Sequence, residues 1–166
     1  MARCRSPNAR PNDWQGIGSE LDEMKNSKRV ALVSCVKTKS NHTLPAKDLY
    51  ISDWFKKARA LVERSGTEWF ILSAEHGLLD PDDEIEPYER TLKTMGVAEK
   101  RAWAARVAAQ METKLPDADE IIVLAGMDYR AYLMPYLRSR FASVVIPMEG
   151  LTSGRQLNWL EHAKTI

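Results

Sequence analysis

The sequence predicts a three-layer α/β/α domain with a mostly parallel central sheet of about four strands. Four short apolar runs recur along the chain, at residues 29–35, 69–73, 121–125 and 143–146. Continuous apolar runs are typical of strands that are covered on both faces. Segments with helical spacing separate the runs, and strands joined in this way form parallel sheets with helices on each face.

The segments between the runs predict four helices. Apolar residues recur three or four positions apart around residues 51–62, 97–115, 129–136 and 157–160. Gly66 and Pro116 are expected to end the first two helices. A loop without regular structure is expected from Ala74 to about Tyr88.

The domain is expected to span residues 29–166, because 166 residues fit a single domain. Residues 1–28 are polar and contain Pro7 and Pro11, so we expect a flexible N-terminal arm.

The sequence has no apolar run near the roughly 20 residues of a membrane span, and no secretory signal is expected. With only two cysteines, Cys4 and Cys35, a cytoplasmic location is the expectation. The net charge of +1 argues neither for nor against a nucleic-acid partner.

In a parallel sheet, ligands bind at the carboxyl ends of the strands, so the loops that follow the strands carry the candidate site. After the first strand, Cys35, Lys37 and Lys39 would point the same way if the chain stays extended. Two neighbouring ammonium groups favour an anion such as phosphate between them, and the alternative is a solvated loop. Cys35 is interpreted as a small buried residue rather than a nucleophile, because no His or Asp has a diagnostic spacing from it.

The loop after the second strand holds His76, Glu86 and Tyr88. Pro87 keeps this segment extended, which would place a carboxylate and an aromatic ring over the crevice. Gly77 permits a sharp reversal, after which the two following leucines should contact the core. Residues 80–84 are interpreted as a solvated acidic bend, so neither a metal site nor a cofactor is expected.

The third and fourth loops add carboxylates and hydroxyl groups. Asp128 follows Gly126 and is expected to cap the next helix, with Tyr129 beside it. Glu149 opens a loop with two glycines, Ser153 and Arg155, which is typical of a phosphate cradle. The alternative is a simple turn in which Ser153 is the N-cap.

Three separated motifs occur in order along the chain: Ser34-Cys35-x-Lys37-x-Lys39, Ser73-Ala74-x-x-Gly77-Leu78 and Pro87-Tyr88-x-x-Thr91-Leu92. Together they resemble a bacterial domain family that is itself similar to the YaaA peroxide-stress proteins. The resemblance covers about residues 29–160 and implies a role linked to DNA. A more distant similarity is to the uracil-DNA glycosylase superfamily, which places a catalytic loop after the first strand and a Ser-containing loop before the last helix. The similarity implies a uracil-DNA-glycosylase-like fold, although the Asp of the first motif and the His of the last are missing here.

We therefore expect a DNA glycosylase that excises a damaged or modified base, in repair or in defence against phage. Such an enzyme stacks a flipped base, stabilises a cationic sugar and grips the neighbouring phosphates. The candidates for stacking are Tyr88 or Tyr129, and Asp128 or Glu149 would read the edge of the base. Glu86 would stabilise the cation or orient water. The candidates for phosphate are Lys37, Lys39, Ser153 and Arg155.

Three alternatives remain open at this point. Lys37 would attack the sugar directly in a lysine-dependent mechanism. The chain would otherwise be a DNA-binding stress protein without catalysis, or a nucleosidase or deoxyribosyltransferase that acts on free nucleotides. No obligatory protein partner and no membrane association are expected.

Overall fold

A computed structural model of the chain describes residues 27–166. The central sheet has five strands in the order β4-β3-β1-β6-β7. These strands are β1 Arg29–Ser34, β3 Glu68–Ser73, β4 Gly77–Leu79, β6 Glu120–Leu124 and β7 Ser143–Val145. All neighbouring pairs are parallel except β3 and β4, so the expected mostly parallel sheet is confirmed. The expected N-terminal arm lies outside the described residues, apart from its last two positions.

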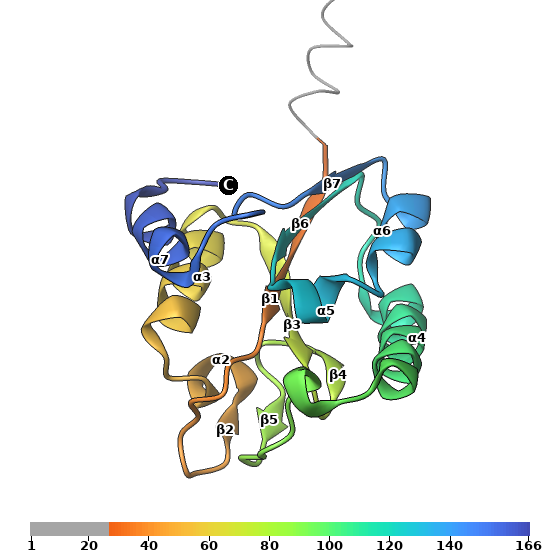
Figure 1. Cartoon of the computed structure of the whole chain (residues 1–166). Helices are drawn as coiled ribbons and strands as arrows, with labels where there is room; N and C mark the ends of the chain where they lie inside the picture. The colour runs from red at the N-terminus through yellow and green to blue at the C-terminus, as the bar shows by residue number, and fades with distance from the viewer. Residues whose placement is uncertain (1–26) are drawn as a thin grey trace, which may run out of the picture.

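Helices cover both faces of this sheet (Figure 1). Helices α3 (Asp53–Arg64) and α7 (Ser153–His162) lie on one face, and α4 (Val97–Lys114) and α6 (Met134–Arg140) lie on the other. Shorter elements lie at the lower edge of the view or next to the strand ends: α2 (Ala46–Leu49), the 3-10 turn Leu92–Thr94 and α5 (Met127–Arg130). The arrangement is the three-layer one that the alternation of runs predicts.

The strand β4 corrects the expectation of an unstructured loop after β3. Gly77 has φ of 76°, a conformation that residues with a side chain rarely adopt, and the chain reverses there. Leu78 then pairs with Leu72, and both side chains are fully buried. A second short strand, β5 (Glu84–Ile85), pairs with β2 (Leu44–Pro45) in a separate antiparallel sheet. The segment is therefore folded onto the domain along most of its length.

The helix expected over residues 129–136 is divided in two. α5 ends at Arg130, and α6 begins at Met134 with Pro135 in its first turn. A proline has no N–H to donate, and it is therefore tolerated in the first turn of a helix but not in its interior. Ile51 likewise lies before α3 rather than in it, and 41% of its surface is exposed.

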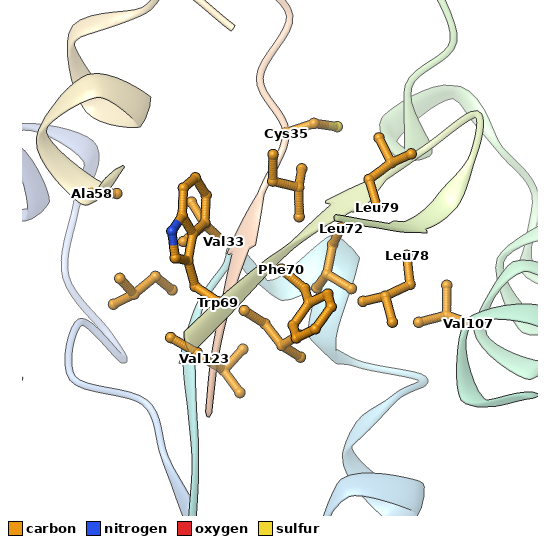
Figure 2. Close-up of a cluster of buried hydrophobic side chains, with 14 of the residues drawn as sticks. Val33, Cys35, Ala58, Trp69, Phe70, Leu72, Leu78, Leu79, Val107 and Val123 are labelled. Atoms are coloured by element: carbon orange, nitrogen blue, oxygen red, sulfur yellow. The ribbon is translucent and has the colours of Figure 1, made fainter. Parts of the chain in front are cut away.

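The core lies on both sides of β3 and β1. Figure 2 shows Trp69 directed toward the helix that carries Ala58, whereas Phe70 and Leu78 lie on the side of Val107. Because all the inner strands are covered on both faces, their side chains are buried without alternation, as their apolar sequences predict. Within residues 27–166, no helix combines the length and the apolar character that crossing a membrane requires.

Candidate functional site

The strand order places a topological switch point between β1 and β6. From β1 the chain first adds β3 on one side, and later adds β6 on the other. The connection after β1 leads toward β3, and the connection after β6 leads the opposite way, toward β7. This divergence opens a crevice at the carboxyl ends of β1 and β6. A pocket of about 590 Å³ lies there, a size within the usual range for ligand sites. Its lining includes Ser34, Cys35, Val36, Lys37, Trp54, Thr91, Lys93, Thr94, Gly126, Asp128, Tyr129 and Gln156.

The apolar wall of this switch-point pocket is held by specific contacts. The Cys35 sulfur is hydrogen-bonded to the Tyr129 hydroxyl at 3.0 Å, which joins the end of β1 to α5. The Tyr129 ring meets the Trp103 ring edge to face, with 5.8 Å between centroids. Burial raises the pKa of Tyr129 well above its usual value, and Cys35 adds to this effect. Tyr129 therefore stays protonated and fixed at neutral pH.

The opposite wall is formed by the starts of α3 and α7. The Trp54 indole N–H donates to the Gln156 side-chain oxygen at 2.9 Å. The Gln156 amide nitrogen donates in turn to the Leu151 carbonyl at 3.0 Å. These bonds fix an aromatic ring and an amide at the pocket wall, where a planar ligand can lie against both.

The charges at the pocket are one carboxylate and two free ammonium groups. Asp128 accepts a hydrogen bond from the Lys100 ammonium at 3.0 Å, and its side chain remains 42% exposed. We expected Asp128 to cap the next helix, but Gly126 occupies the N-cap position of α5. Lys37 and Lys93 are exposed, and neither forms an ion pair within residues 27–166. The pocket thus combines an acceptor with a cationic rim.

Lys39 does not join Lys37 at this rim. The chain bends at Lys37 instead of staying extended, and the Lys39 ammonium lies 4.4 Å from the centre of the Tyr88 ring. Burial lowers the pKa of Lys39, against smaller opposite effects of Cys35 and Glu89. The expectation that alternation turns Cys35, Lys37 and Lys39 to the same side is therefore wrong.

Tyr88 belongs to a hydroxyl network behind the pocket. Its hydroxyl lies 2.6 Å from that of Tyr50 and 2.8 Å from Ser73 Oγ. Ser73 is fully buried and also accepts the His76 backbone N–H at 3.0 Å. This network fastens the segment before Thr91 to the end of β3, and so it supports the pocket rather than lining it.

The other candidates of the second loop line a separate hollow. His76, Glu86 and Tyr88 share a hollow of about 530 Å³ near β5. The His76 and Tyr88 rings meet edge to face there, with centroids 5.5 Å apart. Glu86 is therefore separated from the switch-point pocket, and Asp128 is the one carboxylate candidate that lines that pocket within residues 27–166.

The fourth loop is divided between two further sites. Glu149 pairs with Arg130 at 3.2 Å and lines a hollow beside the switch-point pocket. Ser153 is exposed and is not the N-cap of α7, since Thr152 occupies that position. Arg155 is exposed and lines an outer groove along α7. The expected cradle of Ser153 and Arg155 is therefore not assembled in this arrangement.

Several lining residues were not identified from the sequence. Trp54 lies in a predicted helix and Gln156 lies directly before one, and spacing alone does not show which residue reaches a pocket. Thr91 was named in the sequence, as part of the motif Pro87-Tyr88-x-x-Thr91-Leu92, but not as a site residue. Lys93, two positions further on, could have been found from that motif.

The fold and the pocket define an α/β domain, covered on both faces, with a ligand-sized pocket at its switch point. The chain belongs to DUF6884, a family of unknown function, whose model matches residues 30–162. It is 32% identical over 114 residues to the uncharacterised protein YfjM of Bacillus subtilis (strain 168), a match that covers 64% of this chain and 75% of YfjM. No solved structure matches the chain. Within residues 27–166, no cluster of three or more His, Cys, Asp or Glu residues that would hold a metal ion is present.

Proposed function

We propose that this domain is a DNA glycosylase-like enzyme that hydrolyses the N-glycosidic bond of a damaged or modified nucleobase. The observation that carries the proposal is the composition of the switch-point pocket. Aromatic side chains, one carboxylate and two ammonium groups that form no ion pair among the described residues surround a single space of about 590 Å³. These are the groups that a flipped nucleotide needs on its base, its sugar and its phosphates.

The base would lie against the apolar wall of the pocket. Tyr129 on this wall and Trp54 on the opposite wall give aromatic surface, and both are held by hydrogen bonds that fix their orientation. Stacking on aromatic rings contributes roughly 1–3 kcal/mol per base in single-stranded complexes. Cys35 fits as part of this wall, since only 6% of its surface is exposed and its sulfur is hydrogen-bonded.

Asp128 is the carboxylate that we place at the reacting sugar. Departure of a base leaves positive charge on the sugar ring, which a nearby carboxylate stabilises electrostatically. Lys100 fixes one Asp128 oxygen, and the partial exposure of the side chain leaves the carboxylate accessible to substrate or to water. Asp128 thus replaces Glu86 and Glu149 as our first candidate.

Lys37 supports a second mechanism at the same site. Because it lines the pocket, its amine is a candidate to attack the sugar carbon as the base leaves. The amine must be deprotonated to attack, and its bond to the sugar carbon replaces the bond to the base. Opening of the ring C–O bond, with transfer of the remaining nitrogen proton to the ring oxygen, then gives an imine, which borohydride reduces to a stable protein–DNA adduct. Trapping in the parent protein, and its loss in Lys37→Met, would assign the lysine mechanism. Base release without trapping would assign a water mechanism and leave Lys37 as a phosphate contact.

The arrangement is compatible with the resemblance to uracil-DNA glycosylases. The loop after β1 lines the pocket through Cys35 and Lys37, and residues 150–152 before α7 line the adjoining hollow. We propose that both loops face the flipped nucleotide. The departures in the two motifs are consistent with a carboxylate supplied from α5 instead.

The experiment that tests the proposal is release of free base from a panel of DNAs, read by mass spectrometry and by strand cleavage at abasic sites. The panel contains uracil, oxidised bases and hypermodified phage DNA, so that it covers both repair and defence. Release from one substrate would establish the activity. Tight, salt-sensitive duplex binding without release would support a non-catalytic DNA-binding protein, and turnover of a mononucleotide alone would support a nucleosidase.

A further inference from the structure

Arg130 is a buried arginine with incomplete hydrogen bonding. Only 7% of its surface is exposed, and its Nε atom is buried without a hydrogen-bond partner among the residues that the structure describes. Nη1 donates to Glu149 at 3.2 Å, and Nη2 forms no hydrogen bond within residues 27–166. Leaving a buried donor unpaired costs about 1–3 kcal/mol, and more for a charged group. An ion pair with Glu149 alone therefore does not account for this side chain.

The unused atoms form one edge of the guanidinium. Nε and Nη2 present parallel N–H groups, the geometry that binds two oxygens of a carboxylate or phosphate at once. Since Nε is covered, the guanidinium must turn or the loop around Gly150 must shift as a ligand enters. Gly150 has φ of 76°, and no atom lies within 4 Å of the place that a β-carbon would take there.

Arg130 lines a hollow of about 410 Å³ at the carboxyl ends of β6 and β7. This hollow adjoins the switch-point pocket, because Trp54, Gly126 and Gln156 line both. Thr152, the N-cap of α7, also lines the hollow, and its side chain makes no capping bond. The start of this ten-residue helix therefore borders the hollow without a side-chain cap on its first N–H groups.

Glu149 is the exchangeable partner of Arg130. Its side chain is 63% exposed, and a single contact joins it to the guanidinium. Only the carboxylate side of this ion pair is exposed, so water can take over the contacts of Glu149 when a better oxyanion displaces it from Arg130. Glu149 would then occupy the site only when no anion is bound.

We propose that this hollow is an oxyanion subsite for a phosphate group, formed by Arg130 and the start of α7. That the phosphate belongs to a DNA strand, next to the nucleotide whose base lies in the switch-point pocket, rests on the proposed function. The binding of phosphate by Arg130 does not rest on it.

The test measures binding of inorganic phosphate by calorimetry in the full-length protein and three variants. Arg130→Met keeps the side-chain volume and should weaken binding by roughly tenfold or more, since it removes a charge-assisted pair. Glu149→Gln removes the competing carboxylate and should tighten binding by roughly two- to fivefold. Arg138→Gln, an exposed position on α6, is the matched control and should change affinity by less than about twofold.

Glu149→Gln keeps the proposal testable if Arg130→Met does not fold. Weaker or unchanged phosphate binding in Glu149→Gln, or no saturable binding by the parent protein, would overturn the subsite. Competition by an abasic DNA oligomer that is stronger than competition by a mononucleotide would support the DNA strand as the source. Equal competition would overturn that assignment.

The two proposals fail separately in these measurements. Phosphate binding with the expected variant pattern, but no base release from any DNA, would retain the subsite and remove the glycosylase. Base release that is unaffected by Arg130→Met, in a protein that binds no phosphate, would retain the glycosylase and remove the subsite.

Discussion

The sulfur of Cys35 lies 3.0 Å from the hydroxyl of Tyr129, and this contact joins the end of β1 to α5 across the switch point. The two residues are 94 positions apart in the sequence. Their contact closes one wall of the pocket and orients the tyrosine ring. It therefore links the stability of the fold to the shape of the candidate site.

Removal of this hydroxyl tests that link. We expect Tyr129→Phe to lower the free energy of unfolding by about 1 kcal/mol, because one partly buried hydrogen bond is lost while the ring contact with Trp103 remains. Tyr132→Phe is the control, since the Tyr132 hydroxyl forms no hydrogen bond within residues 27–166, and should cost no more than about 0.5 kcal/mol. Urea denaturation measures both. Equal losses would show that the Cys35 contact has no special weight.

The Tyr88 hydroxyl gives a pH-dependent prediction. Burial, and then the proximity of Cys35 and Tyr50, raises the pKa of Tyr88 far above its usual value. The folded chain therefore holds this proton more tightly than the unfolded chain, in which Tyr88 ionises near pH 10. The stabilising contribution of Tyr88 is complete below about pH 10 and is lost as the pH rises beyond it.

The variant Tyr88→Phe isolates that contribution. At pH 8 it should be less stable than the parent protein by about 1–3 kcal/mol, because the Tyr50 and Ser73 hydroxyls lose a partner. Above pH 10 the difference should shrink by up to about 1.4 kcal/mol per pH unit. Chemical denaturation from pH 8 to pH 11 measures it. A difference that stays constant over this range would contradict a raised pKa for Tyr88.

The reversal at Gly77 accounts for the attachment of β4. A β-carbon at this position would lie 2.2 Å from Gln110 Oε1, the atom that accepts the Leu78 N–H. Gly77→Ala should therefore cost a conformational penalty of about 1–2 kcal/mol and a hydrogen bond besides. Gly66→Ala is the matched control, because Gly66 has φ of 65° but open space around it, and should show the conformational penalty alone. Thermal unfolding that gives the same loss for both variants would exclude the steric account.

The two lysines at the pocket rim, which form no ion pair in the described part of the chain, predict a salt dependence. If Lys37 and Lys93 both contact phosphates, the double variant Lys37→Gln, Lys93→Gln should reduce the slope of log K against log salt by about 2 for duplex DNA. Lys164→Gln should leave the slope unchanged, because the chain end lies by the start of β1, where Arg29 bonds the Ile166 carbonyl. Fluorescence anisotropy at several salt concentrations measures the slopes. An unchanged slope in the double variant would remove these residues from the DNA contact.

The parallel part of the fold was predictable because β1, β3 and β6 are buried on both faces and their sequences are continuously apolar. The additional strand β4 was not predictable, because it has only three residues and depends on Gly77 and Gln110, which are far apart in the sequence. The break between α5 and α6 depends on Pro135. It was not predicted, because a proline occurs both in the first turn of a helix and after the end of one.

The sequence predicted that the candidate residues gather at the carboxyl ends of the strands, and the structure brings only part of that set together there. Cys35, Lys37, Asp128 and Tyr129 meet in one pocket, as the strand-end argument requires. Glu86 and His76 do not, because β4 and β5 fold their loop away from the switch point. Arg130 was not identified, since a charged residue one position after Tyr129 gives no sign in the sequence that it is buried.

The most direct test of the central claim is the single-turnover rate of base release by Asp128→Asn. The substrate is whichever DNA of the panel the parent protein cleaves, and Asp117→Asn, exposed before β6, is the control. We expect Asp128→Asn to lose about 100-fold or more, because it removes the electrostatic partner of the sugar cation, and Asp117→Asn to keep the parent rate. An undiminished rate in Asp128→Asn, with the loss appearing in Glu86→Gln instead, would contradict the switch-point pocket as the catalytic site.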